Sequence, residues 1–366
     1  MVHFFIGTKA QFIKMAPVMV EMQKRGIAYR YIDSGQHGEL TRSLRQTFGI
    51  REPDVNLSKN GRDITTMAAA AKWMFRFWMY CIFNKKWLRE KVFSGGGICL
   101  VHGDTLSTLL GLRMAKAAGL AVGHVEAGLR SYNYFNPFPE ELIRLYCMKR
   151  CDVLFAPSRE AEKNLHSMRI AGKIVLVDGN TVVDALRLVE NANVTVKIPS
   201  EPYALAACHR LETITNRPRL EKIIDLLNRV ASEMRVIFVI HKPTQQYLEK
   251  FDLKKKISSG VDVLGMQDYM NFTALMRNAK MVLADGGSIQ EECSYLDKPC
   301  LILRHKTERP DGLGRNAMLW EFKAEVLEGF LKTVKNIRLT EQQWPQPSKQ
   351  IVDNLEKHYG QDFIPR

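Results

Sequence analysis

The sequence predicts an α/β protein with two doubly wound, Rossmann-like domains that face each other across a cleft. Three observations support this prediction. Short apolar runs alternate with longer stretches of helical periodicity, polar clusters follow the apolar runs directly, and 366 residues exceed what one ordinary core organises. Continuous runs rich in Val, Ile, Leu and Phe are typical of parallel strands that are buried on both faces.

The predicted strands are the apolar runs themselves. They span Val2–Gly7, Tyr29–Ser34, Ile98–His102, Ala121–Val125, Asp152–Ala156, Lys173–Val177, Tyr203–Cys208, Arg235–Ile240, Val261–Leu264, Lys280–Ala284 and Pro299–Leu303. Helical patterns such as Thr105–Ala118 and Leu220–Met234 lie between them. Strand–helix alternation of this kind predicts parallel sheets with helices on both faces.

A change of composition near residue 180 predicts the domain boundary. The stretch Asp178–Pro202 is polar and holds two prolines. We therefore expect an N-terminal domain over residues 1–180 and a C-terminal domain over 181–345. The last stretch, 346–366, has a helical pattern and is expected to pack back on the first domain.

The charge and the cysteines restrict the class of protein. A formal net charge of +14 favours an acidic partner, which could be nucleic acid, an anionic membrane or a phosphorylated small molecule. No RNA-binding or DNA-binding motif accompanies the charge, so nucleic acid is not expected. The seven cysteines form no CxxC pair, which is typical of reduced thiols in a cytoplasmic protein. No basic region precedes a long apolar one at the N-terminus, so no secretory signal is predicted.

The segment Lys72–Phe93 combines aromatic residues with cations. Arg76, Lys85, Lys86 and Arg89 interrupt it, so it makes a poor membrane span. On one continuous helical wheel these charges scatter and leave no clean apolar face, which favours a packed helix. Aromatic residues beside cations also suit lipid headgroups, so a peripheral contact with the inner membrane face through 72–93 remains open.

Polar clusters follow most predicted strands, where open α/β sheets bind their ligands. The stretch Asp285–Glu292, DGGSIQEE, supplies glycines for a close backbone approach and a helix start that can bind phosphate. Ser288 and Glu291 also fit a capping box. In GTKAQFIK, Lys9 and Lys14 lie around a strand–helix turn and could neutralise a diphosphate. No GxGxxG follows a strand and no GxxxxGKS is present, so neither a dinucleotide fingerprint nor a P-loop is expected.

Four carboxylates follow two successive apolar runs and are candidates for acid/base chemistry. They are Asp104, Glu126, Glu140 and Glu141. A carboxylate at a strand end can transfer protons if burial raises its pKa. Asp104 could instead cap the helix that follows it, and Glu141 could pair with Arg144 on a helix. No comparable local role accounts for Glu126.

The histidines and cysteines show no spacing typical of a metal site, and no GxSxG elbow is present. His209, His241 and His305 each follow an apolar run, and a lone histidine of this kind is more often structural than catalytic. His209 carries more weight because Arg210 and Glu212 accompany it.

In their order along the chain, these clusters resemble the non-hydrolysing UDP-N-acetylglucosamine 2-epimerase family. The resemblance rests on HGDT, HVEAGLRS, NPFPEELIR, DGNTVVDAL, HRLE, DGG with IQEE, KP and TERP, from about residue 4 to residue 325. It implies a glycosyltransferase-B-type fold, a homodimer, and UDP held in the cleft without a cofactor. It also implies inversion at C2 of UDP-GlcNAc by elimination of UDP to 2-acetamidoglucal and re-addition, giving UDP-ManNAc for surface polysaccharide precursors.

The resemblance also assigns roles to residues. Asp104, Glu126 and Glu140 match the family's catalytic carboxylates, and His209 matches a histidine near the phosphates. Gly287 and Ser288 would meet the diphosphate and Glu292 the ribose. The expected substrate-binding residues are Lys9, Lys14, Arg130, Arg210, His241, Gly287, Ser288, Glu292 and Arg309.

The chain departs from the family pattern at several positions. Lys9 and Gln11 replace an arginine and a glutamate, GGS replaces SGG, and the asparagine of HxNP is missing after His241. Gln36 and His37 of the GQH motif, near which bacterial members bind an activating UDP-GlcNAc, are retained, although the residues that follow differ. A modified UDP-HexNAc, a hydrolysing reaction that releases ManNAc and UDP, and a membrane-associated glycosyltransferase of the same fold remain alternatives. The three retained carboxylates disfavour a transferase and a non-catalytic sensor.

Overall fold

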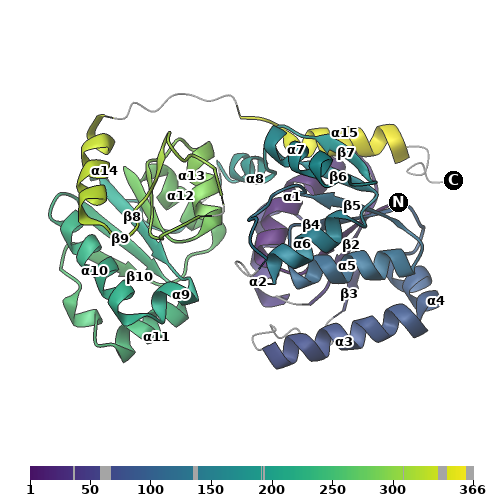
Figure 1. The fold of residues 1–366 in the computed structure, drawn as a ribbon, viewed down its shortest axis with the longest axis horizontal. Helices are drawn as coiled ribbons and strands as arrows, with labels where there is room; N and C mark the ends of the chain where they lie inside the picture. The colour runs from purple at the N-terminus through teal and green to yellow at the C-terminus, as the bar shows by residue number, and fades with distance from the viewer. Residues whose placement is uncertain are drawn as a thin grey trace. The chain divides into compact units, whose positions relative to one another are not determined.

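The computed structural model describes residues 1–35, 38–57, 67–134, 139–190, 192, 194–307, 309–336 and 344–359. The chain forms two compact units (Figure 1). Unit 1 comprises Met1–Leu188 together with Pro345–Arg366, and unit 2 comprises Val189–Trp344. The observed division therefore falls at residue 188, a few residues after the position expected from composition.

Unit 1 is built on a seven-stranded sheet of order β3-β2-β1-β4-β5-β6-β7, in which every pair of neighbours is parallel. Its strands are β1 (Val2–Ile6), β2 (Tyr29–Asp33), β3 (Val55–Asn56), β4 (Ile98–His102), β5 (Ala121–Val125), β6 (Val153–Ala156) and β7 (Lys173–Leu176). Its helices are α1 (Lys9–Lys24), α2 (Gly38–Phe48), α3 (Met67–Phe83), α4 (Lys85–Trp87), a π-helix (Leu88–Val92), α5 (Leu106–Ala117), α6 (Glu140–Met148), α7 (Arg159–Ser167), α8 (Val182–Leu188) and α15 (Pro347–Tyr359).

Unit 2 is built on a six-stranded parallel sheet of order β10-β9-β8-β11-β12-β13. Its strands are β8 (Tyr203–Cys208), β9 (Arg235–Ile240), β10 (Val261–Leu264), β11 (Met281–Ala284), β12 (Cys300–Ile302) and β13 (Ala317–Leu319). Its helices are α9 (Leu211–Ile214), α10 (Arg217–Ala231), α11 (Lys242–Lys250), a 3-10 turn (Lys254–Lys256), α12 (Tyr269–Asn278), α13 (Gly287–Tyr295) and α14 (Ala324–Asn336).

The prediction of two Rossmann-like parallel sheets is confirmed. Each predicted apolar run forms a strand, to within one residue at either end. The two additional strands, β3 and β13, have two and three residues and are too short to appear as apolar runs. Buried strand residues dominate both cores, as expected when helices cover both faces of a sheet.

The last helix belongs to unit 1, because α15 lies against α1. Ile351, Val352 and Leu355 are buried along one side of α15. Arg25, the C-cap of α1, donates to Asp353 at 2.6 Å and to Glu356 at 2.5 Å. The polypeptide therefore leaves unit 1 after α8, builds unit 2, and returns to unit 1.

The aromatic segment 72–93 is not one helix, so the expectation that it lacks an apolar face is wrong. The segment breaks at Asn84 into α3, α4 and the π-helix, and a single wheel drawn across the break mixes different faces. One side of α3 packs on the core through buried Phe77 and through Trp73. The other side exposes four large apolar side chains: Phe75 (61%), Trp78 (44%), Ile82 (44%) and Phe83 (69%).

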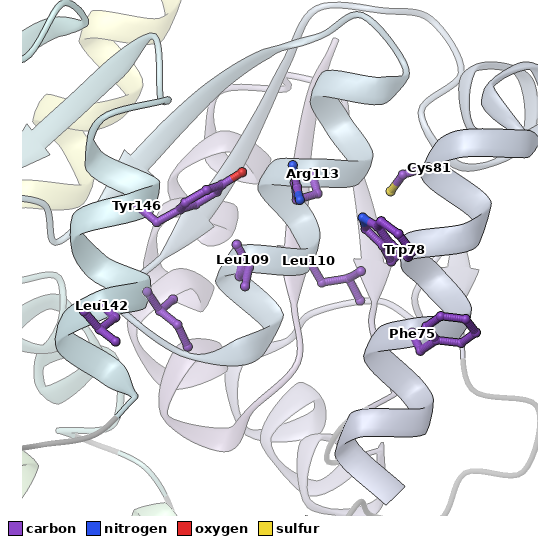
Figure 2. Close-up of a pocket in the computed structure, with 9 residues that line it drawn as sticks. Phe75, Trp78, Cys81, Leu109, Leu110, Arg113, Leu142 and Tyr146 are labelled. Atoms are coloured by element: carbon purple, nitrogen blue, oxygen red, sulfur yellow. The ribbon is translucent and has the colours of Figure 1, made fainter. Parts of the chain in front are cut away.

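A groove of about 450 Å³ runs beside this exposed strip of α3 (Figure 2). Its walls come from α3, α5 and α6, and they are formed by Phe75, Trp78, Cys81, Leu109, Leu110, Arg113, Leu142, Ile143 and Tyr146. The Arg113 guanidinium lies 5.5 Å from the centre of the Tyr146 ring. Among the helices described, none combines the length and the apolar character of a membrane span.

Candidate active site

In unit 1, the ionisable candidates gather at the carboxyl ends of three neighbouring strands. Asp104 follows β4 after one glycine, and Glu126 follows β5 directly. Helix α1 begins after β1, where Thr8 caps it and forms a reciprocal capping box with Gln11. The Gln11 side chain also donates to the His102 carbonyl at 2.8 Å, which ties the start of α1 to the end of β4.

Glu126 is a buried carboxylate that receives two side-chain donors. It is 9% exposed, and Lys14 Nζ and Asn180 Nδ2 both donate to its Oε2 atom. His102 Nε2 lies 3.7 Å from the same oxygen. The backbone of Glu126 has a φ of +65°, a left-handed conformation that non-glycine residues rarely adopt and that is often found at functional sites. Lys14 and Glu126, both predicted as site residues, are thus in contact, and Asn180, which was not predicted, joins them.

Asp104 and Glu141 share one cation. Arg144 donates to Asp104 and, at 2.8 Å, to Glu141. Asp104 does not cap the following helix, because Thr105 occupies the N-cap of α5, so that alternative is wrong. Arg144 therefore holds Asp104 in place, one glycine beyond the end of β4.

Glu141 is a structural anchor. Its side chain is fully buried and accepts from Arg130 Nε at 2.6 Å and from the Ser131 backbone at 3.1 Å. Burial acts to raise the pKa of Glu141, but the hydrogen bonds from Arg130 and Ser131 and the charge of Arg144 lower it below its ordinary value. The expected pairing of Glu141 with Arg144 is present, and Arg130, a predicted substrate ligand, is part of the same network.

Glu140 lies in the first turn of α6. Its Oε2 atom is buried and makes no hydrogen bond within the described part of the chain. The start of a helix stabilises a carboxylate through the helix dipole, which favours the presence of Glu140 at this position. The structure shows no direct bond from Glu140 to Asp104 or Glu126 among the residues it describes.

His124 supports the turn that carries Asp104. It is fully buried in β5 and donates from Nε2 to the Gly103 carbonyl at 2.7 Å. Burial lowers its pKa to about 4, so the ring stays neutral at physiological pH. This role could not be predicted, because His124 stands inside an apolar run.

In unit 2, the candidate residues follow the neighbouring strands β8, β9 and β11. The rings of His209 and His241 stack with their centres 5.1 Å apart and their planes 16° from parallel. The fully buried Asp285 accepts from the backbone of His209 at 3.1 Å and from that of Arg210 at 2.9 Å. Its carboxylate also lies 3.3 Å from His209 Nδ1. Asp285 therefore orients the turn that presents His209 and Arg210.

A glycine lets α13 approach His209 closely. Gly286 is the N-cap of α13, and a Cβ atom there would lie 2.8 Å from His209 Cε1. No side chain of the described residues caps this helix. Ser288 is the second residue of α13 and not its cap, so the predicted capping box is wrong. Free backbone N–H groups at a helix start, preceded by glycine, form a suitable phosphate site.

The remaining candidates differ in how the structure places them. Arg309 pairs with the buried Glu291 at 2.9 Å, which explains why Glu291 does not serve in a cap. Glu292 is 5% exposed and lies one turn into α13. Lys9 is the first residue of α1 and is half-buried. Gln36 and His37 lie outside the described residues.

The two clusters suit different chemistry. Unit 1 gathers carboxylates with their own cations, which is typical of proton transfer. Unit 2 gathers histidines, an arginine and open backbone N–H groups, which is typical of anion binding. Neither cluster alone identifies a reaction.

Comparison with known proteins identifies the family. A sequence model described as UDP-N-acetylglucosamine 2-epimerase matches residues 20–350. The UDP-N-acetylglucosamine 2-epimerase of Methanocaldococcus jannaschii is 30% identical over 93% of both chains, and that of Methanococcus maripaludis is 28% identical over 96% of both.

Solved structures agree with these relatives. The M. jannaschii enzyme in complex with UDP-GlcNAc and UDP is 28% identical and matches with a TM-score of 0.79, covering 97% of this chain and 99% of that one. The Neisseria meningitidis enzyme bound to UDP-GlcNAc is 26% identical and matches with a TM-score of 0.81, covering 98% and 100%. The expectation of an enzyme of the epimerase class is confirmed, and the chain belongs to the UDP-N-acetylglucosamine 2-epimerase family.

Proposed function

We propose that this protein epimerises UDP-GlcNAc, or a modified UDP-HexNAc, at C2 by eliminating UDP and adding it back. The observation that carries the proposal is the buried Glu126, held by Lys14 and Asn180 directly after β5. Family membership and the solved complexes of relatives with UDP-GlcNAc support the substrate. The product would enter surface polysaccharide precursor synthesis in the cytoplasm.

The chemistry requires acid/base groups because no carbonyl is adjacent to C2 to acidify its proton. A base removes the C2 proton, the electron pair forms a C1=C2 double bond, and the C1–O bond breaks to release UDP. Re-addition joins the diphosphate oxygen to C1 and delivers a proton to the opposite face of C2. We assign these proton transfers to Asp104, Glu126 and Glu140, since each lies at a strand end or helix start of unit 1.

The leaving diphosphate requires positive charge and hydrogen-bond donors. We assign this role to His209, Arg210 and the start of α13, where Gly287 and Ser288 present backbone N–H groups. Glu292 is assigned to the ribose.

Proton NMR in deuterated water tests the proposal. The protein is incubated with UDP-GlcNAc, and the C2 proton signal and the products are followed. Deuterium at C2 with growth of UDP-ManNAc supports elimination and re-addition. Release of free ManNAc and UDP would instead establish the hydrolysing reaction. Binding of UDP without exchange at C2 would contradict the proposal for this sugar and favour a transferase or a modified substrate.

The exposed strip of α3 favours a peripheral location at an anionic membrane, which we propose as a second property. The strip lies beside exposed cations, Lys72, Arg76, Lys85, Lys86, Arg89 and Lys91, with Glu90 as the accompanying acid. Apolar side chains that enter the headgroup region and cations that meet anionic lipid together give interfacial binding.

Sedimentation with vesicles tests this location. The protein should sediment with phosphatidylserine vesicles at low salt, whereas Phe75→Ser/Trp78→Ser should stay in solution. Failure of the parent protein to sediment contradicts the membrane proposal. A second copy of the chain could cover this strip instead of a membrane. Light scattering on the parent protein and on the variant tests this alternative. A dimer that is present in the parent and lost in the variant would assign the strip to self-association.

A further inference from the structure

We infer that Asn180 is a positioning residue for Glu126. Its side-chain amide fixes the orientation of the carboxylate that pairs with Lys14. This inference rests on the proposed epimerase chemistry and deepens it. Asn180 lies in the loop after β7, whereas Glu126 directly follows β5. Strand β6 lies between these two strands, so the amide reaches across the end of one strand to the carboxylate.

The orientation of the Asn180 amide is determined by its own hydrogen bonds. The side chain is 5% exposed, and its Oδ1 accepts from the Val182 backbone at 3.1 Å, at the start of α8. With the oxygen committed there, the Nδ2 group faces Glu126 and donates to Oε2. Because both ends of the amide are hydrogen-bonded, the Asn180 side chain has few alternative rotamers, and its orientation is fixed.

Lys14 and Asn180 make different contributions although both donate to the same oxygen. Lys14 brings a charge on a long side chain with several rotatable bonds. Asn180 brings a neutral, planar donor whose position is set by the backbone of α8. Two converging donors fix the rotamer of a carboxylate and favour its ionised form. Glu126 also stands on a left-handed backbone, a conformation that persists only when the surrounding structure holds it.

Among the described residues, titratable groups near Glu126 include members of α1, β4 and β5. Lys14 of α1 pairs with its carboxylate, and His102 at the end of β4 lies 3.7 Å from it. The charges of Arg144, Asp104 and Glu126 act on the pKa of His124 in β5. Asn180 is the neutral member of this set, so changing it to aspartate adds one titratable group and leaves the others in place.

The experiment compares Asn180→Asp with Asn271→Asp. Asn271 in unit 2 is a matched control. It is 7% exposed, its Oδ1 accepts from the Thr195 backbone at 2.9 Å, and its Nδ2 donates to the carboxylate of Asp268 at 3.1 Å. Both substitutions therefore replace an amide that bridges a backbone N–H and a carboxylate. Only Asn180 touches a proposed catalytic group.

We expect Asn180→Asp to place a second carboxylate against Glu126, so that the pair retains a proton at neutral pH. The kcat for UDP-GlcNAc epimerisation at pH 7 should fall roughly 10- to 100-fold. This loss is a part of the ~10²–10⁴-fold rate enhancement that general acid/base catalysis contributes. KM should change less than threefold. The acidic limb of the kcat profile should move to higher pH by about one unit or more. Asn271→Asp should keep the parent profile.

Unfolding temperatures and a second variant separate positioning from folding. If Asn180→Asp does not fold, Asn180→Ser supplies the test, with the expected outcome of a lower kcat and an unchanged KM. A parent-like kcat and pH profile in the folded variant would overturn the inference, and so would an equal loss in Asn271→Asp. If the parent protein shows no exchange at C2 of the sugar, the proposed function itself fails, and this outcome is distinct because it does not involve Asn180.

Discussion

The polar clusters of the two units occupy the same place in similar sheets but are built in opposite ways. In unit 1 the carboxylates are paired through side chains: Glu126 with Lys14, and Asp104 and Glu141 with Arg144. In unit 2 the buried Asp285 instead holds backbone N–H groups of the next turn. The ends of the strands position both clusters, and the partners of the carboxylates distinguish the proposed proton-transfer site of unit 1 from the proposed anion site of unit 2.

The largest expected effect tests whether the proposed catalysis belongs to unit 1 and the proposed UDP binding to unit 2. Glu126→Gln removes the proposed acid/base group and should lower kcat by about 10³-fold or more, since such groups contribute ~10²–10⁴-fold. UDP affinity should change less than threefold, because the proposed UDP ligands belong to unit 2. Steady-state kinetics and calorimetric titration with UDP measure the two effects. Glu160→Gln, an exposed residue of α7 in the same unit, is the control. Loss of UDP binding in Glu126→Gln would show that the residue is structural.

The second effect tests how far unit 1 depends on shared cations. Arg144→Ala leaves Asp104 and the fully buried Glu141 without their common partner, and removal of one member of a buried pair costs roughly 3–5 kcal/mol of unfolding free energy. Urea denaturation measures this loss. Arg150→Ala removes an exposed guanidinium that lies over the Tyr146 ring and should cost about 0.5–1 kcal/mol. Equal losses in the two variants would contradict the buried network.

The third effect concerns the pH dependence of unit 1. Burial lowers the pKa of His124 to about 4 from the ordinary 6.5, so on acidification the unfolded chain takes up a proton before the folded one. Stability should therefore fall as the pH decreases from 6.5 to 4, by roughly 3 kcal/mol from this group. His124→Gln, which can still donate to Gly103, should reduce this slope, as measured by denaturation across the range. His166→Gln at an exposed position should keep the parent slope.

The smallest effect tests the close approach in unit 2. Gly286→Ala forces the His209 ring to move, because the added Cβ would lie 2.8 Å from its Cε1 atom. UDP affinity should weaken about tenfold, equivalent to 1.4 kcal/mol, with no change in C2 chemistry once the site is saturated. Gly265→Ala, where an added Cβ has no atom within 4 Å, is the matched control. An unchanged affinity in Gly286→Ala would remove His209 from the diphosphate site.

The strands of both sheets could be predicted because a strand buried on both faces is a continuous apolar run. The helix break at Asn84 was not predicted, because aromatic residues and cations occur on both sides of it. Local patterns also misled where a distant partner competes: Ser288 and Glu291 fit a capping box, but Glu291 pairs with Arg309. The Asn180–Glu126 contact joins residues far apart in the sequence, so no local pattern could indicate it.

The return of α15 to α1 has a consequence for biosynthesis. A ribosome releases the strands of unit 1 first, then all of unit 2, and only afterwards the helix that covers α1. Until then, the surface of α1 that contacts α15 is uncovered, and Arg25 lacks its acidic partners on α15. Unit 2 can complete its fold during synthesis, whereas unit 1 is completed only when α15 emerges. A nascent chain stalled before residue 347 should therefore be the form of this protein that chaperones and proteases recognise most readily.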